Sequence, residues 1–321
     1  MFIGDAGMKK FKVITHKDLD GVGCGVVARS IFRKQYVFIK FVDYKDVNQV
    51  VRETLLNESD KCDHVFITDI SVDKETAELI ESDFPDKVNL IDHHPGLDWL
   101  NEYNWALVSP GEPNKTDTPS GTSLFYEFLQ LKLNINSYKK LEEFTEIVRK
   151  YDTWIWHTIF HDDIPKKMND YLGMVGFFDF MDEMVDNIIN NKPLLSENAE
   201  LKLKVREKEI DVYIKTKNKQ INRVDIDNKK VGFVYAENFH SELGNKLMEM
   251  NPDLDLVIIV DLGRKKISIR SVEEKHVDCT EIAKEWYGGG GHKCASGAMI
   301  PDIIDETVKS ILFRKYKVTN E

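Results

Sequence analysis

The chain has 321 residues, of which 42% are hydrophobic and 31% charged, and a formal net charge of −11. This length favours two domains, and the hydrophobic content is ordinary for a globular protein. No run approaches the ~18 consecutive apolar residues of a membrane helix. The negative charge argues against a protein that coats long nucleic acid. Without a signal-peptide pattern or CxxC spacing among the four cysteines, we expect a cytoplasmic protein.

Strand and helix patterns alternate along the first half of the chain. Short apolar, β-branched runs predict strands at Phe11–Thr15, Tyr36–Val42, His64–Ile70 and Lys87–His94. Helices are predicted at Val22–Phe32, around residues 51–58, and from Ser71 onward. This alternation predicts an α/β fold with a doubly wound, mainly parallel sheet. Residues 119–180 are predicted to be mainly helical.

A change in composition separates the second half. Residues 194–222 are rich in lysine and glutamate and predict a solvated connecting helix. Strand patterns then return, with a hairpin-like turn at residues 263–266 and four glycines at 288–291 before His292. We therefore predict a catalytic domain over residues 1–190, a helical linker over 191–222 and a smaller α/β domain over 223–321.

Acidic and imidazole side chains gather at the carboxyl ends of the predicted strands. They are His16, Asp18, Asp20, Asp69, Asp92, His93 and His94. The carboxyl ends of parallel strands meet at one edge of a sheet. Like charges crowded there are costly unless a cation neutralises them. Mixed carboxylate and imidazole ligands suit manganese best, with zinc, iron or cobalt as alternatives. Their number favours two ions over one.

The glycines at positions 21, 23 and 25 follow these acids directly. In a metal site they let the helix begin close to the ions and keep side chains out. A nucleotide-cofactor loop is the alternative, because Gly21-x-Gly23 with Asp43 partly imitates a dinucleotide fingerprint. Val26 replaces the third glycine, and a pyrophosphate would be repelled by the aspartates. The hypothesis of a metal site is therefore favoured over that of a nucleotide-cofactor loop.

Several short motifs of the chain occur together, and in the same order, in a known family. HKDLDG (16–21), ITDIS (67–71), IDHH (91–94) and KYDTW (150–154) resemble the four motifs of the DHH phosphoesterase superfamily. SIRS (268–271) and GGGGHKCASG (288–297) resemble its C-terminal DHHA1 domain. The residues of HKDLDGVGCG and YDTW are most similar to those of the nanoRNase B branch of oligoribonucleases.

This resemblance implies a set of roles for residues of this chain. One ion would be held by His16, Asp18 and Asp69, and the other by Asp20, Asp69, His93 and Asp152, with Asp69 bridging. Asp92 would orient an imidazole, and His94 would contact the phosphate or protonate the leaving oxygen. In the second domain the substrate would be bound by Arg270, Gly289, Gly290, Gly291 and His292. Trp154 and Trp156 are expected to be core or cleft-wall residues rather than base-stacking platforms.

The resemblance also implies an activity. The expected enzyme is a phosphodiesterase that binds two divalent metal ions. Mn²⁺ is the expected ion, with Mg²⁺, Co²⁺ or Zn²⁺ as alternatives. A hydroxide bridging the ions would attack very short RNA or DNA, two to five nucleotides long, and release mononucleotides. Hydrolysis of linear or cyclic dinucleotides or of 3′-phosphoadenosine 5′-phosphate stays open, as does a non-catalytic nucleotide-binding regulator. Neither a membrane nor a long duplex is an expected partner, and a homodimer stays open.

Overall fold

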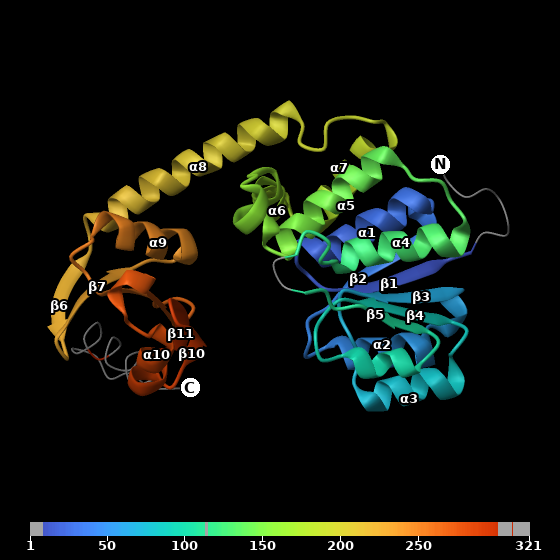
Figure 1. Ribbon diagram of the computed structural model, residues 1–321, viewed down its shortest axis with the longest axis horizontal. Helices are drawn as coiled ribbons and strands as arrows, with labels where there is room; N and C mark the ends of the chain where they lie inside the picture. The colour runs from blue at the N-terminus through green and yellow to red at the C-terminus, as the bar shows by residue number, and fades with distance from the viewer. Residues whose placement is uncertain (1–8, 113–114, 301–309, 311–321) are drawn as a thin grey trace. The chain divides into compact units, whose positions relative to one another are not determined.

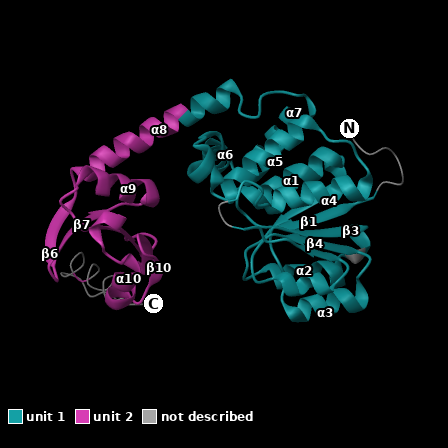
Figure 2. Cartoon of the chain, viewed as in Figure 1, with its two compact units in different colours: residues 1–203 teal, residues 204–321 magenta. Residues whose placement is uncertain are grey.

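The fold was analysed in a computed structural model, which describes residues 9–112, 115–300 and 310. The chain divides into two compact units, residues 1–203 and 204–321 (Figures 1 and 2). Each unit has a sheet of its own, so each is described separately.

The first unit is built on a five-stranded sheet in which all neighbouring strands run parallel. The strand order is β2-β1-β3-β4-β5. The strands are β1 (Phe11–Thr15), β2 (Val37–Phe41), β3 (His64–Thr68), β4 (Val88–Asp92) and β5 (Ala106–Val108). The doubly wound, parallel α/β prediction is thereby confirmed. The short β5 was not predicted.

Helices cover both faces of this sheet (Figure 1). One face carries α1 (Leu19–Ile31), α4 (Gly121–Leu133), α5 (Lys139–Asp152), α6 (Ile164–Val175) and α7 (Phe177–Ile189), and the other carries α2 (Val47–Asn57) and α3 (Lys74–Asp83). Each layer has its own apolar core. A sheet buried on both faces explains why the strands read as continuous apolar runs.

The first helix begins earlier than its apolar pattern predicts. α1 starts at Leu19 rather than Val22, because the Asp18 side chain accepts a hydrogen bond from the Gly21 amide and caps the helix. The acidic residues after β1 therefore belong to the first turn of a buried helix. Asp20, within that turn, is only 1% exposed.

The two tryptophans after α5 differ in exposure. Trp156 is 6% exposed, as expected of a core residue, whereas Trp154 is 52% exposed. Of the two expected places, core or cleft wall, the exposure of Trp154 excludes the core. Its backbone is left-handed, with φ of +63°, which turns the chain sharply just after the helix ends.

The second unit contains a six-stranded mixed sheet in the order β10-β11-β9-β8-β7-β6. Its strands are β6 (Asn222–Ile226), β7 (Lys229–Tyr235), β8 (Leu256–Asp261), β9 (Lys266–Arg270), β10 (Gly290–His292) and β11 (Ala295–Met299). Its helices are α9 (His240–Met250) and α10 (Cys279–Tyr287). The predicted turn at residues 263–266 joins the antiparallel strands β8 and β9.

The lysine- and glutamate-rich segment forms one long helix, α8 (Glu197–Asn218). The boundary between the units, at residues 203 and 204, falls inside this helix. The run of four glycines is not simply a loop. Gly288 ends α10 with a φ of +67°, and Gly290 already belongs to β10. Among the described residues, no helix is long and apolar enough to cross a membrane.

Candidate metal centre

Four segments of the first unit bring acidic and imidazole side chains together at the carboxyl edge of the sheet. They are the β1–α1 turn, the ends of β3 and β4, and the last residue of α5. The side chains are His16, Asp18, Asp20, Asp69, His93 and Asp152. All six predicted metal-binding residues therefore belong to groups whose ligand atoms lie within 4.8 Å of one another.

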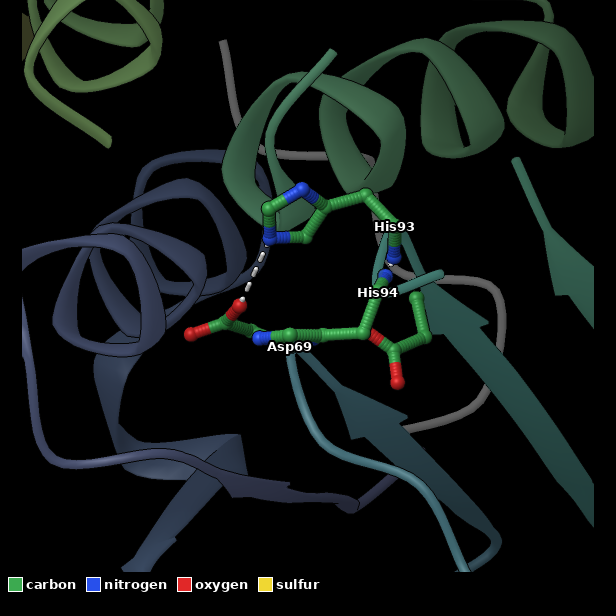
Figure 3. A group of neighbouring side chains, drawn as sticks. Asp69, His93 and His94 are labelled. Carbon is green, nitrogen blue, oxygen red and sulfur yellow. Dashed lines mark hydrogen bonds and ion pairs between the residues drawn. The ribbon is translucent and has the colours of Figure 1, made fainter. Parts of the chain in front are cut away.

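His93 lies at the centre of one group. Its Nε2 atom is 3.3 Å from Asp69 Oδ1, a contact marked by the dashed line in Figure 3, and 3.5 Å from both Asp20 Oδ2 and Asp152 Oδ2. These contacts are too long or misaligned for hydrogen bonds, and His93 Nε2 and Asp69 Oδ2 are buried without hydrogen-bond partners in the described chain. Buried polar atoms are normally satisfied.

This arrangement fits a bound metal ion. With metal–ligand distances of about 2.0–2.2 Å, neighbouring ligand atoms lie roughly 3.0–3.5 Å apart. His93 Nε2 lies at about that spacing from each of the three carboxylate oxygens. A divalent cation would satisfy both orphaned atoms and neutralise the crowded carboxylates.

A second group shares Asp69 with the first. His16 Nδ1 lies 2.8 Å from Asp18 Oδ2, and both residues have ligand atoms close to Asp69. The hydrogen bond that the Asp18 carboxylate accepts raises the pKa of the His16 imidazole. Asp69 therefore offers a ligand atom to more than one candidate metal-binding group.

The Asp20 carboxylate is held by the N-terminus of α4. The Gly121 and Thr122 amides donate to its Oδ2 and Oδ1 atoms at 2.6 and 2.9 Å, and the Thr122 hydroxyl donates to the Asp20 carbonyl at 2.6 Å. A Cβ atom on Gly121 would lie 2.6 Å from the Asp69 Cβ. No local sequence pattern predicts these contacts, because α4 begins about a hundred residues after Asp20.

Two carboxylates of the cluster have raised pKa values. Burial, and then the negative charges of Asp20 and Asp18, raises the pKa of Asp69 well above its usual range. The same causes raise the pKa of Asp152 to about 8. Both carboxylates would ionise far more readily beside a cation, which is the behaviour expected of metal ligands.

Asp92 and His94 lie beside the cluster but have other partners. The buried Asp92 carboxylate accepts hydrogen bonds from the His93 and His94 amides, from the Ser71 hydroxyl and from His94 Nδ1. His94 Nε2 lies 3.2 Å from the hydroxyl of Tyr44, a residue that the sequence analysis missed. Asp92 thus fixes the backbone and ring of His94, and it also belongs to a candidate metal-binding group with Asp69, His93 and His94.

In the second unit, the predicted substrate-binding side chains align across the sheet. His292 of β10 pairs with Ala295 of β11, which pairs with Arg270 of β9. Residues directly opposite one another lie on the same face. Within the described chain, Arg270 has no carboxylate partner, and Gly244 of α9 makes room for its side chain. Gly289 packs against the backbone of Gly297, while Gly290 is open to approach.

Gly21 of α1 allows the turn that carries His16 to lie against the helix. A Cβ atom at this position would lie 2.3 Å from the backbone oxygen of His16. Gly21→Ala should therefore displace the His16 backbone and lower the free energy of unfolding by about 3 kcal/mol. Urea unfolding measures this loss.

Gly173→Ala is the matched control, because Gly173 lies within α6 and a Cβ atom there would meet nothing within 4 Å. This control should change stability by less than about 1 kcal/mol, in the stabilising direction. Equal effects of the two substitutions would contradict the proposed close contact.

The fold and this site define a metal-dependent hydrolase of the phosphoesterase type. The model of the DHH family, N-terminal domain, matches residues 10–151. Oligoribonuclease NrnB of Bacillus subtilis (strain 168) is 35% identical over 309 residues, which cover 95% of this chain and 76% of that protein. The chain belongs to the DHH family.

Two solved structures of other proteins have a fold similar to that of this chain. A structure of exonuclease RecJ bound to manganese has a TM-score of 0.56 at 13% identity, covering 94% of this chain and 88% of that one. The pGpG-specific phosphodiesterase PggH from Vibrio cholerae has a TM-score of 0.51 at 14% identity, covering 95% of this chain and 98% of that one. At such low identity these similarities concern the fold alone.

Proposed function

We propose that this chain is a two-metal phosphodiesterase that hydrolyses oligonucleotides of two to five nucleotides to mononucleotides. The observation that carries the proposal is the meeting of six ligand side chains around buried, unpartnered atoms of Asp69 and His93. The similarity to oligoribonuclease NrnB over nearly the whole chain supports the substrate class. Manganese is the proposed ion, and the cytoplasm the proposed compartment.

The ligand sets follow the two groups in the site. His16, Asp18 and Asp69 would hold one ion. Asp20, Asp69, His93 and Asp152 would hold the other. Two bound divalent ions supply an activated water and neutralise charge on the attacked phosphate.

The remaining residues position the substrate. Asp92 holds the His94 ring through Nδ1, leaving Nε2 and the neighbouring Tyr44 hydroxyl to face the reacting phosphate or the leaving oxygen. In the second unit, residues 223–321 would form the substrate-binding domain, with the Arg270 guanidinium and His292 taking a further phosphate. Gly289, Gly290 and Gly291 would allow the backbone of β10 to approach this anion.

The test is a substrate panel. Metal-stripped protein, resupplied with Mn²⁺, is incubated with end-labelled di- to decanucleotides, cyclic dinucleotides and 3′-phosphoadenosine 5′-phosphate. Preferential loss of the shortest linear oligomers supports the proposal. Activity only on cyclic or bisphosphate nucleotides would replace it with a role in nucleotide signalling. Tight binding without turnover would indicate a regulator.

Replacing Arg270 should weaken substrate binding without affecting metal binding. Arg270→Ala removes a fork that matches phosphate oxygens, so KM should rise about tenfold to a hundredfold. Arg270→Lys keeps the charge but not the fork and should give an intermediate KM. Steady-state kinetics on a dinucleotide measures both, and a KM equal to that of the wild type in Arg270→Ala would refute the assignment.

A further inference from the structure

Trp154 is an exposed tryptophan that follows the end of α5 in the candidate metal centre. Helix α5 ends at Asp152, whose carboxylate lies 3.5 Å from His93 Nε2. Two residues later, Trp154 is 52% exposed. Alpha carbons two residues apart lie within about 7 Å. The backbone of an exposed tryptophan is therefore close to the backbone of a candidate metal ligand.

The backbone of Trp154 is unusual for such a residue. Its φ of +63° places it in the left-handed region just after a helix end, and its amide donates to the Tyr151 carbonyl at 3.1 Å. Glycine is the residue most often found there, since a side chain makes this conformation costly. Glycine would therefore form this turn with less strain than tryptophan does.

Trp154 is supported on one side only. Its ring meets the buried Trp156 edge to face, with ring centroids 5.2 Å apart, and is tilted against His157 at 5.7 Å. These contacts hold the ring in place but leave half of it uncovered. Packing accounts for Trp156, which is 6% exposed, but not for the exposure of Trp154.

The ring of Trp154 is uncovered where a neighbouring exposed ring is not. In the turn that follows, Phe160 is also exposed, but the Lys150 ammonium, which lies 3.9 Å from Glu146 Oε1, covers its ring at 4.4 Å. Within the described chain no cation covers the Trp154 ring in this way, so its face is open to a ligand that carries bases. Each base of an oligonucleotide is joined to its phosphate through one sugar, so a base next to a bound phosphate lies close to the ions.

We infer that Trp154 is a stacking platform for a nucleobase of the substrate. The inference rests on the proposed function and deepens it. Every base has a π face, so such a platform selects nucleotides over other phosphate esters while tolerating any sequence. The side chain determines substrate class and does not take part in bond breaking.

The test compares base-bearing and abasic substrates. Dinucleotides with both bases, and with either base removed, are hydrolysed by the wild type and by Trp154→Gly, Trp154→Leu and Trp154→Phe. For the base-bearing dinucleotide, kcat/KM should fall about tenfold to a hundredfold in the glycine and leucine variants, and much less in the phenylalanine variant. For the substrate lacking the stacked base, the variants should match the wild type within about twofold.

Two further readouts separate stacking from a structural role. Trp154→Gly should unfold at the same temperature as the wild type or higher, because glycine relaxes the left-handed turn. Calorimetric binding of a non-hydrolysable dinucleotide should show the same dependence on the base. Phe38→Leu, which removes a 48% exposed ring from β2, is the matched control and should have no base-dependent effect.

Each contrary outcome has a distinct meaning. An equal fall in kcat/KM on base-bearing and abasic substrates would overturn the inference, because it would show that Trp154 acts through Asp152. No fall on either would also overturn it. In both cases the proposed function would stand. A wild type that hydrolyses no oligonucleotide would overturn both.

Discussion

Asp69→Asn is expected to abolish hydrolysis while stabilising the protein in the absence of metal. The Asp69 carboxylate is 1% exposed, and its Oδ2 atom has no hydrogen-bond partner among the described residues. Burial and the charges of Asp20 and Asp18 already disfavour its ionised form. A neutral amide removes this repulsion, so urea unfolding without metal should show a gain of about 1–2 kcal/mol.

The same change should remove the ligand that we propose to be shared by two ions. Turnover of a dinucleotide with Mn²⁺ should fall by about a thousandfold or more, because both ions lose a carboxylate. Asp86→Asn, which makes the same change at an exposed position before β4, should leave both turnover and stability near the wild-type values. Turnover close to the wild type in Asp69→Asn would exclude Asp69 as a bridging ligand.

Asp92→Ala is expected to have the opposite effect on stability. Burial alone would raise the pKa of this carboxyl, but hydrogen bonds from His94 and Ser71 and the backbone amide of His93 outweigh it and lower the pKa below its usual value. When the Asp92 carboxylate is removed, several hydrogen-bond donors lose their acceptor in a fully buried position. The free energy of unfolding should fall by about 3–5 kcal/mol.

Activity should fall as well, because His93 and His94 lose the group that orients them. Loss of such an orienting partner typically reduces metal affinity or activity about tenfold to a hundredfold. Ser71→Ala removes only one of the donors to Asp92 and should cost about 1 kcal/mol in urea unfolding. A fully stable Asp92→Ala protein would show that the hydrogen bonds of Asp92 do not hold this turn.

The sheet could be predicted from sequence because its strands are buried on both faces. The apolar run at residues 11–15 coincides with β1, and the other three predicted strands overlap β2, β3 and β4. Boundaries depended on local capping, and α1 begins three residues early because Asp18 caps it. The strand β10 could not be predicted, since Gly290 and Gly291 carry no side-chain pattern and pair only because β11 lies beside them.

The site was predictable where ligands follow strands and hidden where they depend on distant contacts. His16, Asp69 and His93 follow β1, β3 and β4, so sheet topology alone brings them to one edge. Asp152 ends a helix and was identified only through the family resemblance. The hydrogen bonds from α4 to Asp20 join segments far apart in sequence, and so does the contact of Tyr44 with His94. No local sequence pattern encodes such contacts.

The central claim is a pair of divalent ions bridged by Asp69, and a manganese titration tests it most directly. Metal-stripped wild type and Asp69→Asn would be titrated with Mn²⁺ by calorimetry, with electron paramagnetic resonance on the same samples. The account predicts two ions per wild-type chain with the signal of a coupled pair, and loss of that coupling in Asp69→Asn. A single uncoupled ion in the wild type, or an unchanged coupled signal in Asp69→Asn, would contradict it.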